Sequence, residues 1–367
     1  MVRSLTGIGA NPFARILQPD RSRIAVALLG AGVIAISGTI AVAARLKPSL
    51  GLTKPVDVAV AARPITSFSK AGNAGQHGQL IWRGGLVLSA GTEKFGGYSG
   101  LLLSPDGRDL LAVSDAGGWL KARLDYDGTR PTGLAAASLG SILARDGRPL
   151  RRDRDRDAEG LALAAGSLRK GEALVAFEQN NRIVRYALSG GELGRPIDVI
   201  EPPAALRKYS RDGMEAMTVL KGGPYKDRIV AFSENAGSDG RHAGWIWNTG
   251  KPKPMNVVSH GGFALTDAAS LADGTLILLE RRFTIFEGVR MRMRRIDAAD
   301  VKPGALLDGE VLITADMSDE IDNMEGLAVH TAPNGDTVLT ILSDDNFNRA
   351  IQRTLLLQFT LPPRAGS

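Results

Sequence analysis

The sequence predicts an all-β protein, a β-propeller of five or six blades that follows an N-terminal hydrophobic helix and is closed by strands from both termini. Three observations lead to this prediction. A phrase of the type Glu-Gly-Leu recurs at a nearly constant step, an apolar strand ending in an acidic residue follows each copy, and glycine is abundant, with 44 in 367 residues. A regular step of this size is typical of repeat architectures, and short strands joined by glycine-rich turns are typical of propellers.

The recurring phrase indicates the number of blades. It is clearest at 157–162, 212–218 and 322–328, and degenerate copies stand at 97–102 and 267–272. Aligned on the glutamate, the copies stand at positions 99, 159, 215, 269 and 325, which gives steps of 60, 56, 54 and 56 residues. The residues after the last copy and the strands before position 99 combine into one blade-sized unit. The count predicts five blades, and a six-bladed ring with one strongly diverged blade stays open.

The N-terminal elements precede the repeats. Residues 1–23 are polar and basic and are predicted to be a cytoplasmic n-region. From Ile24 to Ala44 the chain has 21 residues without a charge, which as a helix would cross the roughly 30 Å hydrocarbon core of a bilayer. Residues 24–45 are therefore predicted to be a transmembrane anchor or a signal segment. Ala-Val-Ala at 41–43 favours cleavage, the length of the run favours an anchor, and a buried core helix is the third possibility.

This segment also predicts where the rest of the chain resides. Because basic flanks stay on the cytoplasmic side of a membrane, the chain beyond the apolar segment is expected to be periplasmic. It would be anchored in the inner membrane through an uncleaved helix, or secreted after signal cleavage.

The remaining elements follow in order. Proline and small residues predict a linker at 46–75 that leads into a first strand near 56–61, the propeller is expected at 76–362, and 363–367 form a tail. Apolar second strands that end in an acid are predicted at 110–115, 173–178, 228–234, 276–280 and 338–344, with third strands visible at 182–188 and 355–361. Each repeat is thus a small antiparallel sheet. Such a sheet cannot bury both of its faces alone, and a ring of sheets solves this problem.

Composition excludes several classes of partner and chemistry. The net charge is +6, but the basic residues are scattered and aromatic residues make up only 5% of the chain. We therefore expect no nucleic-acid partner and a mild attraction for small anionic ligands. The sequence has no cysteine, which excludes a disulfide framework and thiol catalysis.

The order of the motifs resembles a known family. Tyr-Ser-Gly-Leu at 98–101, Asp-Ala-Glu-Gly-Leu at 157–161, Gly-Met-Glu-Ala-Met at 213–217, Asn-Met-Glu-Gly-Leu at 323–327 and Ser-Asp-Asp-Asn-Phe at 343–347 are similar to the phytase-like, "esterase-like activity of phytase", family of bacterial β-propeller proteins. The resemblance implies an exported propeller with possible hydrolysis of phosphate or carboxylic esters.

The repeated acids are the candidate site. The first strand of each propeller blade lines the central channel, so acids at corresponding positions should converge at one mouth. Glu159, Glu215 and Glu325 are the candidate catalytic residues, together with His242, which we place in a loop near the mouth. The candidate metal ligands come from the ends of the second strands and the residues after them: Asp115, Glu178, Glu234, Glu280, Asp344, Asn180, Asn235 and Asn346. The candidate substrate-binding residues are Arg182, Arg281, Arg282 and Arg349.

The chemistry of this set predicts a cation site. Crowded carboxylates need cations, arginine partners or raised pKa values, and hard oxygen ligands suit a divalent cation, calcium in preference. A bound ion would polarise an ester, a glutamate would act as base and arginine would stabilise developing negative charge. Alternatively, the acids hold neighbouring blades together. A sugar-lactone hydrolase and a non-catalytic ligand-binding or envelope-scaffold propeller are the rival functions. A Ser-His-Asp mechanism is weakly supported, because no Gly-x-Ser-x-Gly elbow is present.

Overall fold

The computed structural model describes residues 47–72, 75–203, 213–247 and 251–364. These residues form strands and one short helix, α2 (Asp153–Arg156). No helix within the described ranges is long and apolar enough to cross a membrane. The predicted basic n-region and the apolar segment at 24–45 lie outside the described residues.

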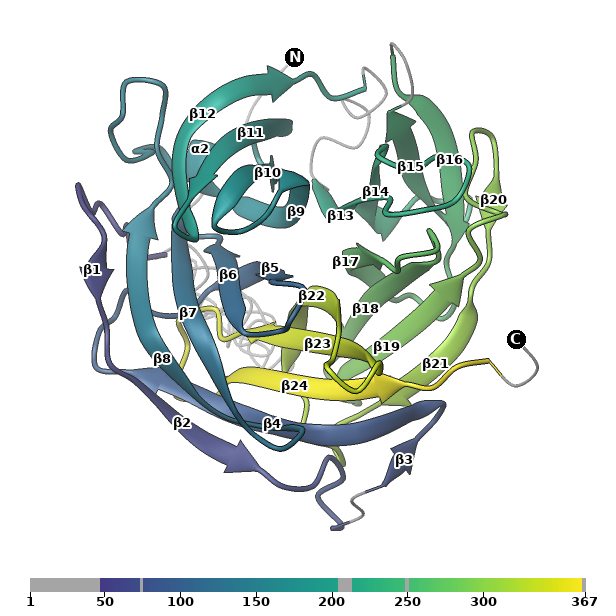
Figure 1. The fold of residues 1–367 in the computed structure, drawn as a ribbon. Helices are drawn as coiled ribbons and strands as arrows, with labels where there is room; N and C mark the ends of the chain where they lie inside the picture. Colours follow the sequence, from purple (N-terminus) through teal and green to yellow (C-terminus); the bar gives the residue numbers. More distant parts are fainter. Residues whose placement is uncertain (1–46, 73–74, 204–212, 248–250, 365–367) are drawn as a thin grey trace, which may run out of the picture. The chain divides into compact units, whose positions relative to one another are not determined.

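Five antiparallel sheets form the blades of a propeller (Figure 1). Blade 1 contains β5 (Tyr98–Leu103), β6 (Asp109–Ser114), β7 (Gly118–Asp127), β8 (Arg130–Ser141) and β1 (Val56–Asp57). Blade 2 contains β9 (Ala158–Gly166), β10 (Lys170–Phe177), β11 (Arg182–Ser189) and β12 (Glu192–Ile200). Blade 3 contains β13 (Met214–Val219), β14 (Ile229–Ala236), β15 (Arg241–Trp247) and β16 (Lys253–Val258), with β20 (Leu306–Leu307) added in parallel.

Blades 4 and 5 complete the ring. Blade 4 contains β17 (Ala264–Ser270), β18 (Leu276–Thr284), β19 (Gly288–Ile296) and β21 (Glu310–Ala315). Blade 5 contains β22 (Asn323–Thr331), β23 (Thr337–Asp344), β24 (Thr354–Leu361), β4 (Leu80–Ala90) and β2 (Val60–Ile65), and β3 (Gln76–His77) also pairs with β4. The inner strands touch in the closed order β5, β9, β13, β17, β22 and back to β5. The ring therefore has five blades, and the six-bladed alternative is wrong.

Strands from both ends of the chain close blade 5, as the sequence predicts. The strand β4 pairs antiparallel with β24, and Leu86 lies opposite Leu356. The stretch 46–75 contains strands at the place where the first strand was expected, and these belong to the propeller: β1 joins blade 1 and β2 joins blade 5. Its prolines suggested a linker. However, Pro64 lies in β2 at the edge of its sheet, where a missing backbone donor is tolerated.

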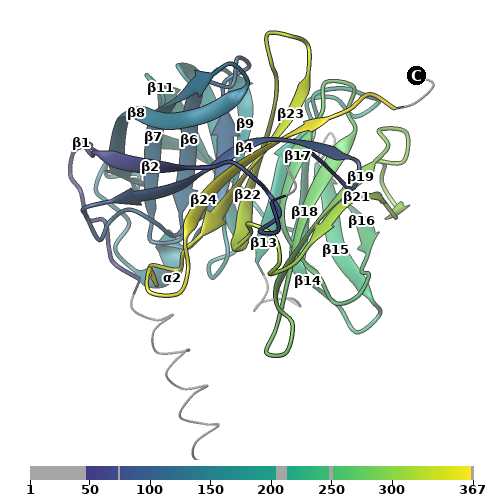
Figure 2. The same ribbon diagram turned by 90° about the horizontal axis from the view of Figure 1, so that it is seen from below.

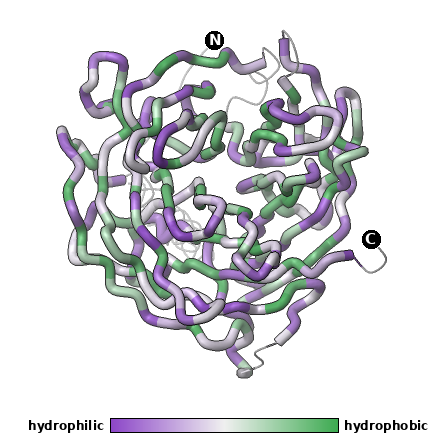
Figure 3. Tube along the Cα trace, in the orientation of Figure 1, coloured by the Kyte–Doolittle hydropathy of each residue, from purple (hydrophilic) through white to green (hydrophobic). Residues whose placement is uncertain are grey.

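The core consists of hydrophobic layers between neighbouring blades. Along β6, Leu110 and Ala112 pack towards blade 5, whereas Leu111 and Val113 pack towards blade 2. Successive residues of a strand point to opposite faces of its sheet, so a strand buried on both faces is apolar at every position. This explains the uninterrupted apolar runs of the second strands. Figure 3 shows hydrophobic stretches throughout the blades, interspersed with hydrophilic ones.

Each inner strand carries a β-bulge at the same place. The register shifts between strands one and two leave one residue of each inner strand without an opposite partner. These unpaired residues are Ser99, Glu159, Glu215, Thr266 and Glu325. The fourth member of the repeat is therefore Thr266, and the alignment on position 269 is wrong. The corrected third and fourth steps are 51 and 59 residues (266 minus 215, and 325 minus 266). The fourth copy has no Glu-Gly pair to fix its register, so sequence similarity alone shifted it by three residues.

Candidate functional site

Two rings of side chains surround one end of the central channel, which we call the mouth. The bulge ring consists of the unpaired residues of the inner strands: Ser99, Glu159, Glu215, Thr266 and Glu325. In each blade the residue before the bulge lies opposite the residue that precedes the strand-end ring, for example Met324 opposite Ser343. The strand-end ring therefore consists of Asp115, Glu178, Glu234, Arg281 and Asp344. Bulges often re-aim side chains next to functional sites, and here they bring two sets of acids to one level.

This register corrects one predicted metal ligand. Glu280 stands one residue before the strand-end ring, opposite Leu265, so its side chain points to the other face of β18. It is fully buried, and its carboxylate accepts hydrogen bonds from Arg292 Nε (2.5 Å) and Arg294 Nη2 (2.6 Å) on the adjacent β19. Glu280 therefore stabilises the interior of blade 4, and Arg281 takes the place of an acid in the ring.

Two cations neutralise part of the mouth. Arg281 Nε lies 3.0 Å from Glu325 Oε1, and Arg281 Nη2 lies 3.3 Å from Glu234 Oε1. On the opposite side Lys47 Nζ lies 2.9 Å from Asp115 Oδ2 and 2.7 Å from Asp157 Oδ1. Arg281 thus links blades 3, 4 and 5, whereas Lys47 links blades 1 and 2.

Sequence reasoning missed Lys47, because it lies in the expected linker. Arg156 of α2 donates a hydrogen bond from Nη2 to the Lys47 carbonyl (2.9 Å), and nearby Leu50 is buried against Gly118. These contacts fix the position from which the ammonium reaches the mouth.

Three carboxylates of blade 2 form the closest acidic group. Asp157, Glu159 and Glu178 each offer an oxygen, and these oxygens all lie within 4.8 Å of one another. Asp157 is buried, whereas Glu159 and Glu178 are half-buried at the mouth. The sequence contained a signal for Asp157, since it is the first residue of the phrase Asp-Ala-Glu-Gly-Leu. The spacing of the three oxygens suits one hard cation bound between them.

Burial and mutual repulsion shift the acids of the mouth towards their neutral forms. Burial raises the pKa of Asp115 to about 6 although Lys47 opposes the shift, and it raises the pKa of Glu325 to about 7 against the effect of Arg281. Burial and the neighbouring Asp157 raise the pKa of Glu178 to about 8.

The other acids of the two rings show the same direction. Burial and adjacent carboxylates hold the pKa values of Glu159, Glu215 and Asp344 well above the ordinary range. Crowded carboxylates behave this way when no cation is bound among them. A divalent ion in the mouth would therefore displace protons.

The other predicted arginines bind partners outside the two rings. Arg182 stacks on Phe177, with its Cζ 3.8 Å from the ring centroid, and it donates to the Asp155 carbonyl. Arg282 donates to the Gly261 carbonyl (2.9 Å) and pairs with Glu287. Arg349 donates to the carbonyls of the loop at 90–95. Of the four predicted arginines, the structure places Arg281 in the strand-end ring and ties the others elsewhere.

The predicted asparagines and His242 also differ in position. Asn180 donates to Asp155 Oδ1 (3.0 Å), whereas Asn235 donates to Glu234 Oε2 (2.7 Å) and so adjoins the strand-end ring. Asn346 follows the ring residue Asp344, whose Oδ1 accepts a hydrogen bond from its backbone nitrogen (2.6 Å). His242 is fully buried in β15, a third strand, and burial lowers its pKa. The expected loop histidine is therefore part of a strand.

Some acids hold blades together, as the alternative interpretation proposed. Asp267 is buried in β17 and accepts a hydrogen bond from the Leu327 nitrogen of blade 5 (2.6 Å). Asp345 of blade 5 accepts from the Gly97 nitrogen of blade 1 (3.0 Å). The ion pair between Arg281 and Glu325 also joins two blades. The mouth therefore combines structural acids with carboxylates such as Glu159 and Glu178 that remain open to solvent.

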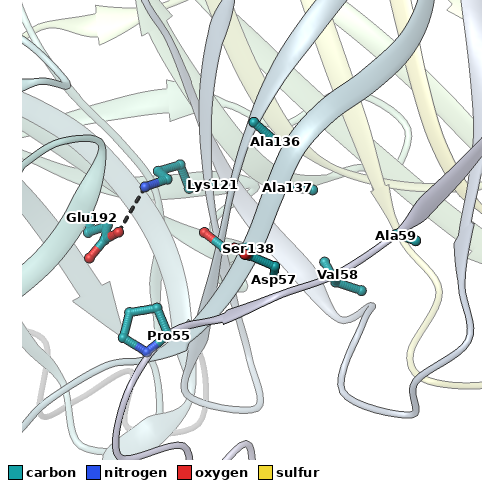
Figure 4. Close-up of a pocket in the computed structure, with 9 residues that line it drawn as sticks. All are labelled: Pro55, Asp57, Val58, Ala59, Lys121, Ala136, Ala137, Ser138 and Glu192. Atoms are coloured by element: carbon teal, nitrogen blue, oxygen red, sulfur yellow. Dashed lines mark hydrogen bonds and ion pairs between the residues drawn. The ribbon is translucent and has the colours of Figure 1, made fainter.

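A surface groove lies apart from these rings. It has a volume of about 580 Å³ and is lined by residues of β1, β7, β8 and β12, among them Asp57, Lys121 and Glu192 (Figure 4). An ion pair between Lys121 and Glu192 (2.8 Å) crosses it from blade 1 to blade 2. The groove contains none of the ring residues, so its polar contacts serve the packing of two blades.

Comparison with known protein families gives a match over most of the propeller. A family model described as "Phytase-like: Esterase-like activity of phytase" matches residues 93–347. The match covers both rings, blades 2, 3 and 4, and all of blade 1 except β1, and it leaves out the strands β1, β2, β3, β4 and β24. No curated protein matches the chain.

Proposed function

The chain belongs to the phytase-like family, and from this membership and the geometry of the mouth we propose a divalent-cation-dependent hydrolase of a phosphate or carboxylic ester. The observation that carries the proposal is the group Asp157, Glu159 and Glu178, whose oxygens lie within 4.8 Å of one another. Carboxylate oxygens are hard ligands, and calcium accepts them in irregular arrangements. Calcium is therefore the preferred ion.

The charge of the mouth supports a requirement for a cation. Acids outnumber Lys47 and Arg281 among the ring residues and their partners, so a mouth whose acids are ionised would repel an anionic substrate unless a cation is bound. The Asp115 Oδ1 atom is buried and has no hydrogen-bond partner among the described residues. An isolated buried carboxylate oxygen is costly, and a bound ion nearby would offset that cost.

Each residue then has a role in the proposed reaction. The bound ion would polarise the ester oxygen and favour attack by water. Glu215, whose carboxyl group faces Glu234, Glu159 and Glu325, keeps its proton near neutral pH because of its raised pKa, and it can donate this proton to the leaving group. Arg281 stabilises negative charge that develops on the substrate.

The proposed location follows from the sequence. With the apolar run at 24–44 as an uncleaved anchor, the propeller would lie on the periplasmic side of the inner membrane. The described unit that contains the propeller begins only three residues later, at Lys47.

Calorimetric titration with calcium tests the cation site. We expect Glu159→Gln and Glu178→Gln to lose binding, because each removes one charged ligand. Glu172→Gln is the matched control, since Glu172 lies on the same strand β10 but pairs with Arg185 (2.8 Å) away from the mouth. Binding that survives in the double variant of Glu159 and Glu178 would rule out this site.

A substrate panel then separates the candidate functions. Calcium-dependent hydrolysis of an aryl phosphate, a phosphodiester or an aryl carboxylic ester, abolished by Glu159→Gln, supports the proposal. Opening of gluconolactone without phosphate release favours the sugar-lactone hydrolase. A protein that binds no metal and turns over no substrate is a binding or scaffold propeller. The ion pair between Arg281 and Glu325 would then serve only to join blades.

A further inference from the structure

The hairpin between β18 and β19 presents three apolar side chains to solvent. Phe283 is 62% exposed, Ile285 is 88% exposed and Phe286 is fully exposed. Single exposed apolar residues are normal on protein surfaces, but a hairpin tip built around Phe-Thr-Ile-Phe is a contiguous apolar projection. Such projections mark sites of contact with another apolar phase or surface.

The hairpin extends from the mouth. The register of β18 and β19 continues past Arg281, a member of the strand-end ring, to Thr284 opposite Gly288. Ile285 is four residues beyond Arg281, so the tip reaches about 13 Å outward from the ring at about 3.3 Å per residue. In Figure 2, α2 and the yellow loop after β23 mark the face of the mouth, and the green hairpin projects on that same face.

Further apolar residues lie on this face. Met317, 49% exposed, adjoins the tip of the hairpin at Gly288. Ile351, in the loop between β23 and β24, is 76% exposed. The projecting surface therefore extends beyond one hairpin and covers loops of blades 4 and 5.

The N-terminal end of the described chain is at the same mouth. Lys47 Nζ contacts Asp115 and Asp157, and only Arg45 and Leu46 separate it from the uncharged run that ends at Ala44. Three residues span at most about 10 Å. If the run crosses a bilayer, the mouth is held within about this distance of the membrane surface. A tip that projects about 13 Å then reaches the interfacial region.

We propose that the Phe283–Phe286 hairpin inserts into the lipid bilayer interface and turns the acidic mouth towards the membrane. The proposal rests on the anchored form of the chain and is independent of catalysis. Arg282 and Arg290 both pair with Glu287 of the same hairpin, so the exposed apolar tip, and not a basic patch, carries the insertion into the apolar boundary. Esters presented at the membrane surface would then reach the site without passing through bulk solvent.

The cysteine-free sequence allows a direct test with single labels. The full chain is reconstituted into vesicles of phosphatidylcholine and phosphatidylglycerol, with an environment-sensitive fluorophore on Phe286→Cys. The control is Ala272→Cys, an exposed position in the turn at the opposite end of the same blade. We expect a blue shift and quenching by nitroxide-labelled lipids at 286 and neither effect at 272.

Each other outcome overturns the proposal. If the label at 286 is as exposed to water as the label at 272, the tip does not enter lipid. A chain that fails to float with the vesicles lacks the anchor on which the proposal rests. As a second variant, Ile285→Ser with Phe286→Ser, labelled at Phe283→Cys, is expected to lose lipid quenching, because two large apolar side chains are removed from the interface. These readouts do not depend on turnover, so an inactive protein leaves the result interpretable.

Discussion

Replacing Arg281 with methionine should destabilise the propeller in a pH-dependent manner. Arg281 lies 3.0 Å from Glu325, and both side chains are largely buried, with 23% and 9% exposed. The pKa of Glu325 is about 7 with Arg281 in place. Without the guanidinium this pKa must rise, so at pH 8.5 the variant loses an ion pair that the native protein retains.

The magnitude follows from the pKa. Each pH unit above 7 makes the ionised pair worth about 1.4 kcal/mol relative to the neutral acid, which gives about 2 kcal/mol at pH 8.5. Two unit charges about 4 Å apart at an effective dielectric constant of about 20 interact by about 4 kcal/mol, which sets the ceiling. At pH 6 Glu325 is largely protonated in both proteins, so the loss should fall below about 0.5 kcal/mol.

Urea unfolding at pH 6 and pH 8.5 measures this difference. Arg282→Met is the matched control, because Arg282 is the next residue of β18 but pairs with the exposed Glu287; its cost should be at most about 1 kcal/mol at either pH. The double variant of Arg281→Met and Glu325→Gln should recover most of the stability lost at pH 8.5. An equal loss at both pH values, or no recovery in the double variant, would refute the reasoning.

Three further predictions concern the mouth. The folded pKa values of Glu325 and Glu178, about 7 and about 8, exceed those of free carboxyl groups. The folded state therefore binds more protons than the unfolded state, and its stability should fall as pH rises from about 5 to 8. Calcium should reduce this decline in thermal melts, and a melting temperature that rises over this range contradicts the assignment. Lys47→Met should raise calcium affinity by about tenfold in calorimetry, because the Lys47 ammonium competes with calcium for Asp115 and Asp157. An unchanged affinity would show that Lys47 does not compete with the bound ion. Gly97→Ala should lower the free energy of unfolding in urea by about 2 kcal/mol, because at φ +67° the new Cβ would lie 2.4 Å from Asp115 Oδ1. Gly128→Ala, at φ +57° with open space around it, should cost only about 1 kcal/mol. Equal losses would contradict the packing argument.

Sequence periodicity was sufficient to predict the propeller ring but not the register of the strands within each blade. The phrase around Glu159, Glu215 and Glu325 marks the inner strands, because a buried strand followed by a tight turn needs the same residues in each blade. In blade 4 the phrase has degenerated, and whether Glu280 or Arg281 reaches the mouth depends on a one-residue bulge. A shift of one residue moves a side chain to the opposite face of a sheet.

Long-range contacts account for the other differences. Lys47 reaches Asp115 and Asp157 from a segment whose prolines suggested a linker. Three of the four predicted arginines donate to carbonyl groups of other segments: Arg182 to Asp155, Arg282 to Gly261 and Arg349 to Thr92. Local sequence cannot specify such pairings, because carbonyl acceptors are available in every loop and tertiary geometry decides which one is closest.

The pairing of β4 with β24 means that the propeller can close only late in folding. These strands come from opposite ends of the chain, and Leu86 meets Leu356 only after nearly all residues have been synthesised. Until then the edge of β4 that β24 will cover is unpaired, and such edges promote association with other chains and capture by quality-control factors. A chain truncated before residue 354 would keep four blades but could not form blade 5 and close the propeller ring. Such a chain should be degraded rather than persist as a partly active fragment.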